Sequence, residues 1–519
     1  MVMTKKLWAE NLRPRFKTVP SWLPISLILF VAVILFTYRL GSEGVWIDEL
    51  FSIRDATSGS LIDVYKTTST RPLYYLLLNF WIRFNSGEVW LRSLSVIFAL
   101  ISVFLIYQVG RRLLGEAEGV IAAGLLTISP LFINHAQEVR MYALSLCLGL
   151  AGTLFLADAL LTERTERPKQ RTMAGWWLFR VLAILTVPLN ITLLIPDAVA
   201  IFWRFRQERA VILSFAKWTV LLLLFFVPGI VPILRDSAPS SEYATDRARY
   251  LVPPGLGNLV YPLKFWMVPN PVVHAGSAVH YFYKAFTLLI AGLLGAALIR
   301  KHKSPALLYT AAWFVLPLIP IIAFSRVAAQ IWEPRYVLFV SPYLFILIAA
   351  GFTHLWRRWK PAAIVIAVIY IMAMGGALTH YFTVQNRSDY RFNVETIEQY
   401  DEPGDAIVWG YGWDNPLEYY YDGDADIYWR DMHRLETSED IQQWVRQFPT
   451  GYARLWVVLD NTNRVFKVAQ EAIAQDYSIE KIYSYERFSK VMLIAPHSQP
   501  ISQSSSDPAT ASTTSSPDP

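Results

Sequence analysis

The sequence predicts a multi-pass α-helical membrane protein that ends in a water-soluble α/β module. Of its 519 residues, 54% are hydrophobic and 14% aromatic but only 17% are charged, which is too apolar for a soluble chain of this length. Runs of about 20 apolar residues, the length that crosses a hydrocarbon core of about 30 Å, recur between Trp22 and Tyr381. After Tyr381 the composition becomes polar, with short alternating segments.

About 11 apolar segments are candidates for membrane spans, and we expect each of them to cross the bilayer. We interpret the net charge of +6 as a signal of membrane orientation. The sequence lacks a basic stripe with interleaved aromatic residues, the pattern that would indicate a nucleic acid partner. The first segment lacks a small-residue cleavage site and is expected to be retained. The segments are 21–39, 91–110, 118–133, 142–161, 176–190, 191–204, 212–234, 280–299, 305–325, 336–355 and 361–381.

The apolar segment 72–84 is left out of the spans, because a stretch of about 10 to 14 residues is more typical of an interfacial or re-entrant segment. If residues 1–20 are cytoplasmic, the positive-inside rule is then obeyed at every turn. The basic clusters on the cytoplasmic side are 111–112, 164–171, 204–209, 300–303 and 357–360. The outer loops are 40–90, 134–141, 235–279 and 326–335.

Residues 386–497 are expected to form the soluble α/β module, on the same outer side. Pro403 and Gly404 indicate a turn before its first strand. Residues 498–519 are rich in Ser, Thr and Pro, which is typical of a disordered tail. The expected strands are 406–409, 455–459 and 491–495, and the expected helices are 394–400, 439–447 and 465–475.

Two adjacent carboxylates, Asp48 and Glu49, follow the first span by a few residues. A partly desolvated carboxylate at a membrane surface can act as a general base or hold a divalent cation. The alternative is a charge pair that favours a helix start. The single cysteine, Cys147, lies in an apolar run and is expected to be a core thiol, so no disulfide and no cysteine nucleophile are expected.

The second outer loop holds a dense polar cluster between two spans. Ionisable residues at membrane depth are costly and usually functional, although two of them could simply pair with other loop residues. His135, His274 and His280 are the outer-side histidines, and none has metal-ligand spacing. The polar residues of the loop are Asn134, His135, Gln137, Glu138, Arg140 and Tyr142.

Four arginines fall at or near the outer ends of spans, where the positive-inside rule does not require them. The planar fork of arginine suits bidentate binding of phosphate, so the set indicates an anionic ligand. Snorkelling to lipid headgroups is the alternative for each one. These arginines are Arg71, Arg92, Arg326 and Arg335.

Four segments follow one another over residues 44–144: GVWIDELFS, TRPLYYLLLNFWIRF, WLRSLSVIFALISVFLIYQVGRRLLG and NHAQEVRMYAL. This succession, with Trp332–Tyr336 before a late span, resembles the GT-C glycosyltransferases, specifically glycosyltransferase family 39, with its protein O-mannosyltransferases and the bacterial lipid A aminoarabinose transferase. The resemblance covers residues 21–381 and implies a GT-C transmembrane catalytic domain over 21–385.

The resemblance implies transfer of a sugar, in mannosyltransferase-like fashion, from a polyprenyl-phosphate donor to an acceptor hydroxyl on the outer face, with inversion. Asp48 would be the base, Glu49 would orient the acceptor, and Glu138 would shape the sugar or acceptor pocket. The phosphate-side cations would be Arg92, Arg140 and Arg335. The remaining substrate-binding candidates are Arg71, Tyr74, His135, Gln137, Tyr142, Glu333 and Tyr336.

One departure concerns residues 69–73, which read STRPL where many relatives carry His or Glu before Pro-Pro-Leu. The acidic metal ligand of the aminoarabinose branch has no match, so the cofactor stays open, with a divalent cation as one option. The expected partners are the lipid-linked donor, a protein or glycoconjugate acceptor and membrane lipid, and the expected location is the plasma (inner) membrane. A transporter or flippase, and a receptor or assembly scaffold, are the alternatives from other classes.

Overall fold

The computed structural model describes residues 22–161, 168–236, 277–298, 304–328, 330–410, 416–432, 435, 437–460, 465–485 and 489–497. The expectations for the N-terminus 1–20, most of the loop 235–279 with His274, and the tail 498–519 lie outside the described residues. The chain divides into two compact units. The membrane unit ends at Asn386, and the α/β unit begins at Arg387 and also contains Gly44–Trp46.

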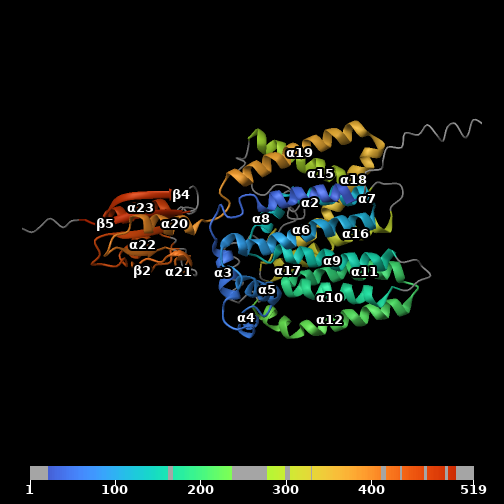
Figure 1. Cartoon of the computed structure of the whole chain (residues 1–519), viewed down its shortest axis with the longest axis horizontal. Helices are drawn as coiled ribbons and strands as arrows, with labels where there is room; N and C mark the ends of the chain where they lie inside the picture. The colour runs from blue at the N-terminus through green and yellow to red at the C-terminus, as the bar shows by residue number, and fades with distance from the viewer. Residues whose placement is uncertain are drawn as a thin grey trace, which may run out of the picture. The chain divides into compact units, whose positions relative to one another are not determined.

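The membrane unit is a bundle of long helices with three short helices at one end (Figure 1). Helices α9 and α10 pack along each other, as do α6 and α7. The short helices are α3 (Ile47–Ala56), α4 (Leu61–Thr67) and α5 (Pro72–Ile82). The other elements are α2 (Trp22–Thr37), α6 (Glu88–Leu113), α7 (Glu116–Thr127), α8 (Pro130–Ala136), α9 (Tyr142–Leu161), α10 (Gln170–Thr186), η1 (Pro188–Leu193), α11 (Leu194–Phe205), α12 (Arg209–Asp236), α15 (Ala278–Leu298), α16 (Pro305–Val315), α17 (Leu318–Val327), η3 (Leu338–Val340), α18 (Ser341–Arg358) and α19 (Lys360–Thr383).

Eight helical segments of the described chain are long and apolar enough to cross a membrane, and a bent pair makes a ninth. The expected number of about 11 also counts α2 and α10. Segments 21–39 and 176–190 form the helices α2 and α10, with 16 and 17 residues in the described chain. Helix α10 stops because Val187 is extended and Pro188 follows it.

The expected span 118–133 is bent by 67° between α7 and α8. Pro130 has no N–H for an intrahelical bond, and the Ser129 side chain caps the new helix by accepting from the N–H of Phe132. Segment 72–84 forms α5, whose 11 residues rise only about 16 Å. The expectation that this segment is too short to cross the bilayer is confirmed.

A buried ion pair inside the bundle joins α10 to α11. The guanidinium of Arg180 donates to both carboxylate oxygens of Asp197, at 2.7 and 3.0 Å, and both side chains are fully buried. The indoles of Trp176 and Trp313 donate to the same carboxylate at 2.8 and 2.7 Å. Arg180 also donates to Thr153 on α9 at 3.0 Å. We name these side chains the intramembrane ion-pair cluster.

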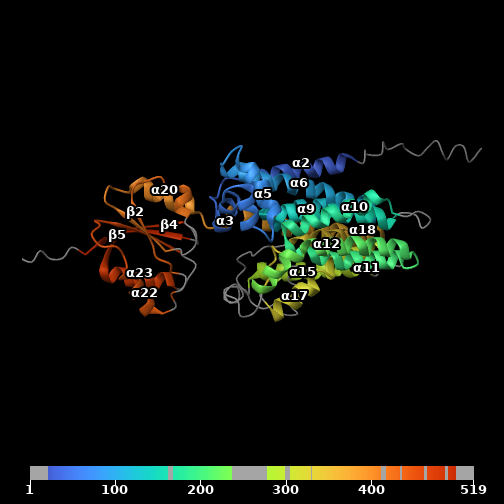
Figure 2. The same ribbon diagram turned by 90° about the horizontal axis from the view of Figure 1, so that it is seen from below.

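The α/β unit contains a five-stranded sheet in the order β2-β1-β3-β5-β4. Strand β1 pairs in parallel with β2 and β3, and β5 pairs in antiparallel fashion with β3 and β4. Figure 2 shows α20 on one face of the sheet and α22 with α23 on the other. The elements are α20 (Tyr390–Tyr400), β1 (Ala406–Trp409), α21 (Pro416–Tyr420), β2 (Asp426–Trp429), α22 (Ser438–Val445), β3 (Leu455–Asp460), α23 (Val465–Asp476), β4 (Tyr477–Tyr485) and β5 (Ser489–Pro496).

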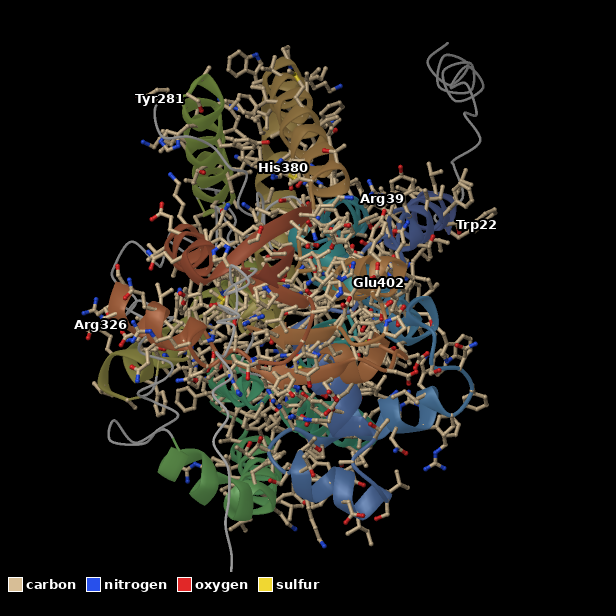
Figure 3. The ribbon with its side chains drawn as sticks, turned by 90° about the vertical axis from the view of Figure 1, so that its left-hand side faces the viewer. Trp22, Arg39, Tyr281, Arg326, His380 and Glu402 are labelled. Carbon is tan, nitrogen blue, oxygen red and sulfur yellow. The ribbon has the colours of Figure 1, made fainter. Side chains whose placement is uncertain are left out.

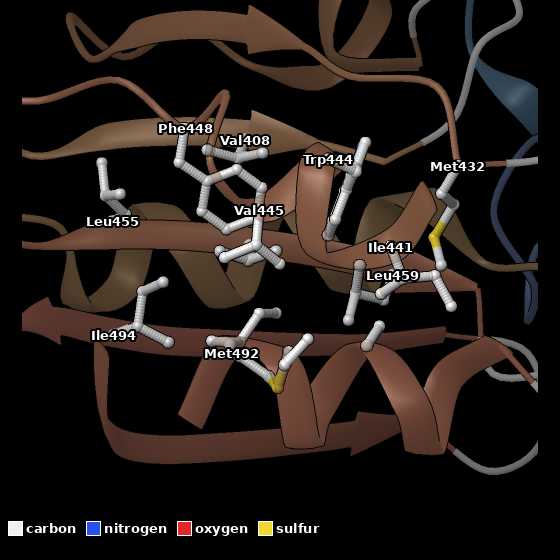
Figure 4. Close-up of a cluster of buried hydrophobic side chains, with 14 of the residues drawn as sticks. Val408, Met432, Ile441, Trp444, Val445, Phe448, Leu455, Leu459, Met492 and Ile494 are labelled. Carbon is white, nitrogen blue, oxygen red and sulfur yellow. The ribbon is translucent and has the colours of Figure 1, made fainter. Parts of the chain in front are cut away.

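The apolar core of this unit lies between the sheet and α22 with α23 (Figure 4). Val408 and Met492 point from the strands toward Trp444 and Phe448 of the helical layer. The three expected strands and three expected helices are present, and the turn at Gly404 has φ +95°. Strands β2 and β4 were not predicted, because both lie at sheet edges and are only partly buried.

Candidate active site

Asp48 lies in the first turn of α3 between two arginines that come from distant parts of the chain. Arg335 Nη1 donates to Asp48 Oδ2 at 2.7 Å, and Arg140 Nη2 lies 3.6 Å from the same oxygen. Arg140 Nη1 also donates to the carbonyl oxygen of Asp48 at 2.8 Å and to the Ser52 hydroxyl at 3.1 Å. The Asp48 side chain remains 20% exposed. The carboxylate is therefore accessible and is held by two cations.

Glu49 faces the opposite way, because consecutive residues of a helix are rotated by about 100°. Its carboxylate is fully buried and accepts two hydrogen bonds from Arg92, at 3.0 and 2.7 Å, and a third from the N–H of Val139 at 2.8 Å. Arg92 also donates to the carbonyls of Leu40 and Glu43, each at 2.8 Å. This pair ties the first loop to α6 and to the second loop.

The geometry bears on two expectations for this pair. Arg92 was expected to contact the donor phosphate, but it is only 1% exposed and its guanidinium already serves Glu49 and two carbonyls. Glu49 was expected to orient the acceptor, but no part of its side chain is accessible. Breaking a buried, bidentate pair to bind a substrate would leave an unpaired charge in the core. Both residues therefore position the loops around the site.

Glu138 lies in the second loop, and its carboxylate is buried and held by two neighbours. Asn134 Nδ2 donates to Glu138 Oε1 at 2.9 Å, and His135 Nδ1 lies 2.9 Å from Glu138 Oε2. Gln137, expected to bind substrate, instead donates to backbone carbonyls at the end of α2 and accepts from Tyr381 on α19 at 2.8 Å. Gln137 thus joins α2 to α19.

Aromatic rings alternate with the two guanidinium groups beside Asp48. Arg140 lies 5.7 Å from the ring of Tyr142, and Arg335 lies 5.4 Å from the ring of Tyr336. The two tyrosine rings are 6.3 Å apart. Burial disfavours the charge of each arginine, but Tyr142 and Asp48 outweigh it and raise the pKa of both above the ordinary value. Both guanidiniums therefore stay cationic at any physiological pH.

Several polar atoms around these rings are buried and have no hydrogen-bond partner in the described part of the chain. Buried polar groups are normally paired, so such a group of atoms indicates a place where a polar ligand binds. Tyr75 and Trp332 were not among the residues predicted for the site, and no local pattern distinguishes them from other aromatic residues in apolar segments. The atoms are Tyr75 OH, His135 Nε2, Arg140 Nε, Tyr142 OH, Trp332 Nε1 and Arg335 Nε.

The other candidates lie at the edge of this site or away from it. Arg71 precedes α5 and lies over the ring of Tyr75 at 5.6 Å, and the buried hydroxyl of Tyr74 lies 3.5 Å from Ser95 Oγ. Glu333 is partly exposed, 4.0 Å from Arg335 Nε. Arg326 lies at the periphery in the last turn of α17 (Figure 3). Within the described residues, no three His, Cys, Asp or Glu side chains form a metal-ligand group.

Comparisons with known proteins show what this chain is similar to. Residues 70–234 match the family model described as dolichyl-phosphate-mannose-protein mannosyltransferase. No curated protein matches the chain significantly.

Solved structures match almost the whole chain. ArnT from Cupriavidus metallidurans, bound to undecaprenyl phosphate, aligns with a TM-score of 0.54 at 14% identity, over 90% of this chain and 97% of ArnT. Its apo state aligns with a TM-score of 0.52 at 13% identity, over the same shares. The apo oligosaccharyltransferase of Archaeoglobus fulgidus aligns with a TM-score of 0.51 at 12% identity, over 91% of this chain and 74% of that protein.

The fold is thus that of ArnT and of the archaeal oligosaccharyltransferase. Residues 70–234 match a domain of the mannosyltransferase type, which is typical of integral membrane glycosyltransferases that use a lipid-phosphate sugar donor. The resemblance found in the sequence is confirmed, and the transporter and scaffold alternatives give way to an enzyme.

Proposed function

We propose that this enzyme moves a sugar from a polyprenyl-phosphate donor to an acceptor hydroxyl on the outer face of the membrane, with inversion at the anomeric carbon. The observation that carries the proposal is the position of Asp48 between Arg335 and Arg140. Two permanent cations meet at the accessible carboxylate of Asp48, and the other carboxylate near Arg335, that of Glu333, is partly exposed and lies 4.0 Å from Nε. A phosphate group suits guanidinium geometry and can bind to both arginines at once.

The paired arrangement also explains how Asp48 becomes a base. Both arginines contact Asp48 through the same oxygen, Oδ2. When the donor phosphate binds, it takes over as their counter-ion, and the carboxylate is released toward the acceptor. The presence of the donor therefore prepares the base, which favours ordered binding with the donor first.

The reaction is then a single displacement. The acceptor oxygen attacks the anomeric carbon as the bond from that carbon to the phosphate oxygen breaks, and Asp48 takes the acceptor proton. The donor is a phosphodiester with one negative charge, and the leaving polyprenyl phosphate gains a second. Arg335 and Arg140 face the growing charge and stabilise it. The roles at the site are thus a base on one side of the sugar and two cations on the other.

The distribution of basic residues supports the outer face. Helix α6 has Arg92 near its start, at the site, and Arg111 and Arg112 in its last turn. Its 26 residues rise about 39 Å, which separates the two ends by a bilayer. Helix α18 likewise begins shortly after Arg335 and ends in basic residues. The positive-inside rule puts these basic ends in the cytoplasm and Asp48 outside.

The chemistry is tested with Asp48→Asn, which keeps the size of the side chain and removes the base. The purified enzyme in liposomes receives radiolabelled polyprenyl-phosphate sugars and envelope extract from a deletion strain. We expect transfer to fall by about 100-fold or more. Asp55→Asn is the matched control, since Asp55 lies on the same helix in an ion pair with the exposed Arg54. Undiminished transfer by Asp48→Asn would remove the base assignment.

The membrane face is tested with single cysteines, because the chain has only Cys147, which is buried. Ser58 is exposed after α3, near the site, and Gln207 is exposed between α11 and α12, beside the basic ends. In intact cells, a membrane-impermeant maleimide should label Ser58→Cys and should leave Gln207→Cys unlabelled until the cells are opened. The reverse pattern would place the site in the cytoplasm.

A further inference from the structure

Two neighbouring buried side chains, His135 and Tyr142, each carry a polar atom without a hydrogen-bond partner of normal geometry in the described chain. The rings of His135 and Tyr142 are 4.8 Å apart, and the two side chains are 3% and 2% exposed. His135 Nε2 has no hydrogen-bond partner in the described chain, and the Tyr142 hydroxyl, which lies beside the Arg140 guanidinium, has none of normal geometry. Burying two such atoms together is costly unless a ligand supplies their hydrogen bonds.

The neighbours of His135 determine what Nε2 offers. Its other ring nitrogen, Nδ1, lies 2.9 Å from Glu138 Oε2, and an ionised carboxylate only accepts hydrogen bonds. Nδ1 therefore carries the proton, and Nε2 of the neutral ring presents a lone pair. Asn134 holds the second carboxylate oxygen of Glu138 at 2.9 Å, so the carboxylate cannot rotate freely. The ring is thus locked in one tautomer and one orientation.

The pair also lies beside the reacting groups. The ring of Tyr142 has the guanidinium of Arg140 at 5.7 Å and the ring of Tyr336 at 6.3 Å. Arg140 and Arg335 both reach Asp48. If the arginines hold the donor phosphate, the sugar attached to it extends only a few ångströms from them. The aromatic surface of Tyr142 and the two unpartnered atoms are within that reach.

We infer that His135 Nε2 and the Tyr142 hydroxyl bind ring hydroxyls of the donor sugar, with Glu138 as the residue that orients His135. This inference rests on the proposed function. A sugar hydroxyl donates to Nε2, and the tyrosine hydroxyl, which both donates and accepts, binds a neighbouring oxygen. Hydroxyls at adjacent ring carbons lie close enough together to serve both atoms. The subsite therefore distinguishes sugars by the presence and configuration of one hydroxyl pair.

The subsite is tested by combining enzyme variants with donors that lack single hydroxyls. His135→Ala removes the hydrogen-bond acceptor, whereas His135→Gln can place an amide oxygen near the position of Nε2. Tyr142→Phe removes the hydroxyl and keeps the aromatic ring. With the intact donor we expect kcat/KM to fall about 10- to 100-fold for His135→Ala and to recover largely for His135→Gln. His380→Ala, in the last turn of α19 (Figure 3), is the control and should leave activity unchanged.

The decisive result is the coupling between residue and hydroxyl. One mono-deoxy donor should lower the kcat/KM of the wild type by a similar factor, and His135→Ala should lose little more with that donor. Losses that simply multiply for every deoxy donor would overturn the subsite, as would a Gln variant as poor as Ala. If Asp48→Asn is inactive while the losses multiply, only the subsite fails; if Asp48→Asn is fully active, the proposed function fails first.

Discussion

Arg335 Nη1 and Asp48 Oδ2 are 2.7 Å apart, although 287 positions of sequence separate the two residues. The contact joins the first outer loop to the segment before η3, so that base and cation belong to opposite ends of the membrane unit's chain. A glycosyl transfer of this kind needs a base to take the proton of the acceptor and a cation to stabilise the leaving phosphate, both in the same site.

Arg335 is expected to act on the leaving phosphate. Arg335→Ala should lower kcat/KM by about 100- to 1000-fold, because a preorganised cation is lost from a partly buried site. Arg335→Lys should recover only part of the rate, since a point charge replaces a planar fork. Steady-state kinetics with a labelled polyprenyl-phosphate sugar measure both. Equal activity of Lys and Arg at this position would show that charge alone suffices.

The Glu49–Arg92 pair is expected to stabilise the fold. Arg92→Met leaves the carboxylate buried and unpaired, which should reduce the free energy of unfolding by about 3 to 5 kcal/mol. The double variant Glu49→Leu with Arg92→Met should regain much of that loss. Thermal unfolding in detergent measures the effect. If Arg92 bound phosphate, Arg92→Met would instead raise the KM for the donor with little change in stability.

The intramembrane ion-pair cluster is expected to behave in the same way, far from the site. Asp197→Ala leaves the Arg180 guanidinium and two indole N–H groups without their acceptor, and should destabilise the bundle by about 3 to 5 kcal/mol. Arg204→Ala on the same helix is the control, because Arg204 is partly exposed at its end. Equal melting temperatures for the two variants would contradict a stabilising role.

Asp405 in the α/β unit predicts a loss of stability in acid. Burial raises its pKa, but hydrogen bonds from Arg454, from the N–H of Glu402 and from Trp456 outweigh burial, so the pKa lies below the ordinary 3.8. A lowered pKa stabilises the fold above about pH 4, and this stabilisation disappears as pH falls through the lowered value. Asp405→Asn should flatten the acid limb of a plot of melting temperature against pH. An unchanged acid limb would assign the effect to other groups.

Local patterns in the sequence were sufficient to predict most of the helices and three of the five strands. The short length of 72–84 predicted a helix that does not cross, and alternating apolar residues predicted β1, β3 and β5. Hydropathy does not register the break at Val187, where α10 ends before Pro188. Edge strand β4 was not predicted, because many of its residues face water. The strand also follows α23 directly, so no turn residue marks where it begins.

The sequence by itself determined that the protein is a membrane protein. It also indicated where most helices and three of the strands lie, and which loops hold ionisable residues. Only the tertiary structure decided what each of those residues does. Asp48 and Glu49 are adjacent and chemically alike, yet one lies between Arg140 and Arg335 and the other is buried against Arg92. Helical rotation points them in different directions, and the partner each one meets comes from a distant helix. Burial and pairing depend on these long-range contacts, which no local pattern contains.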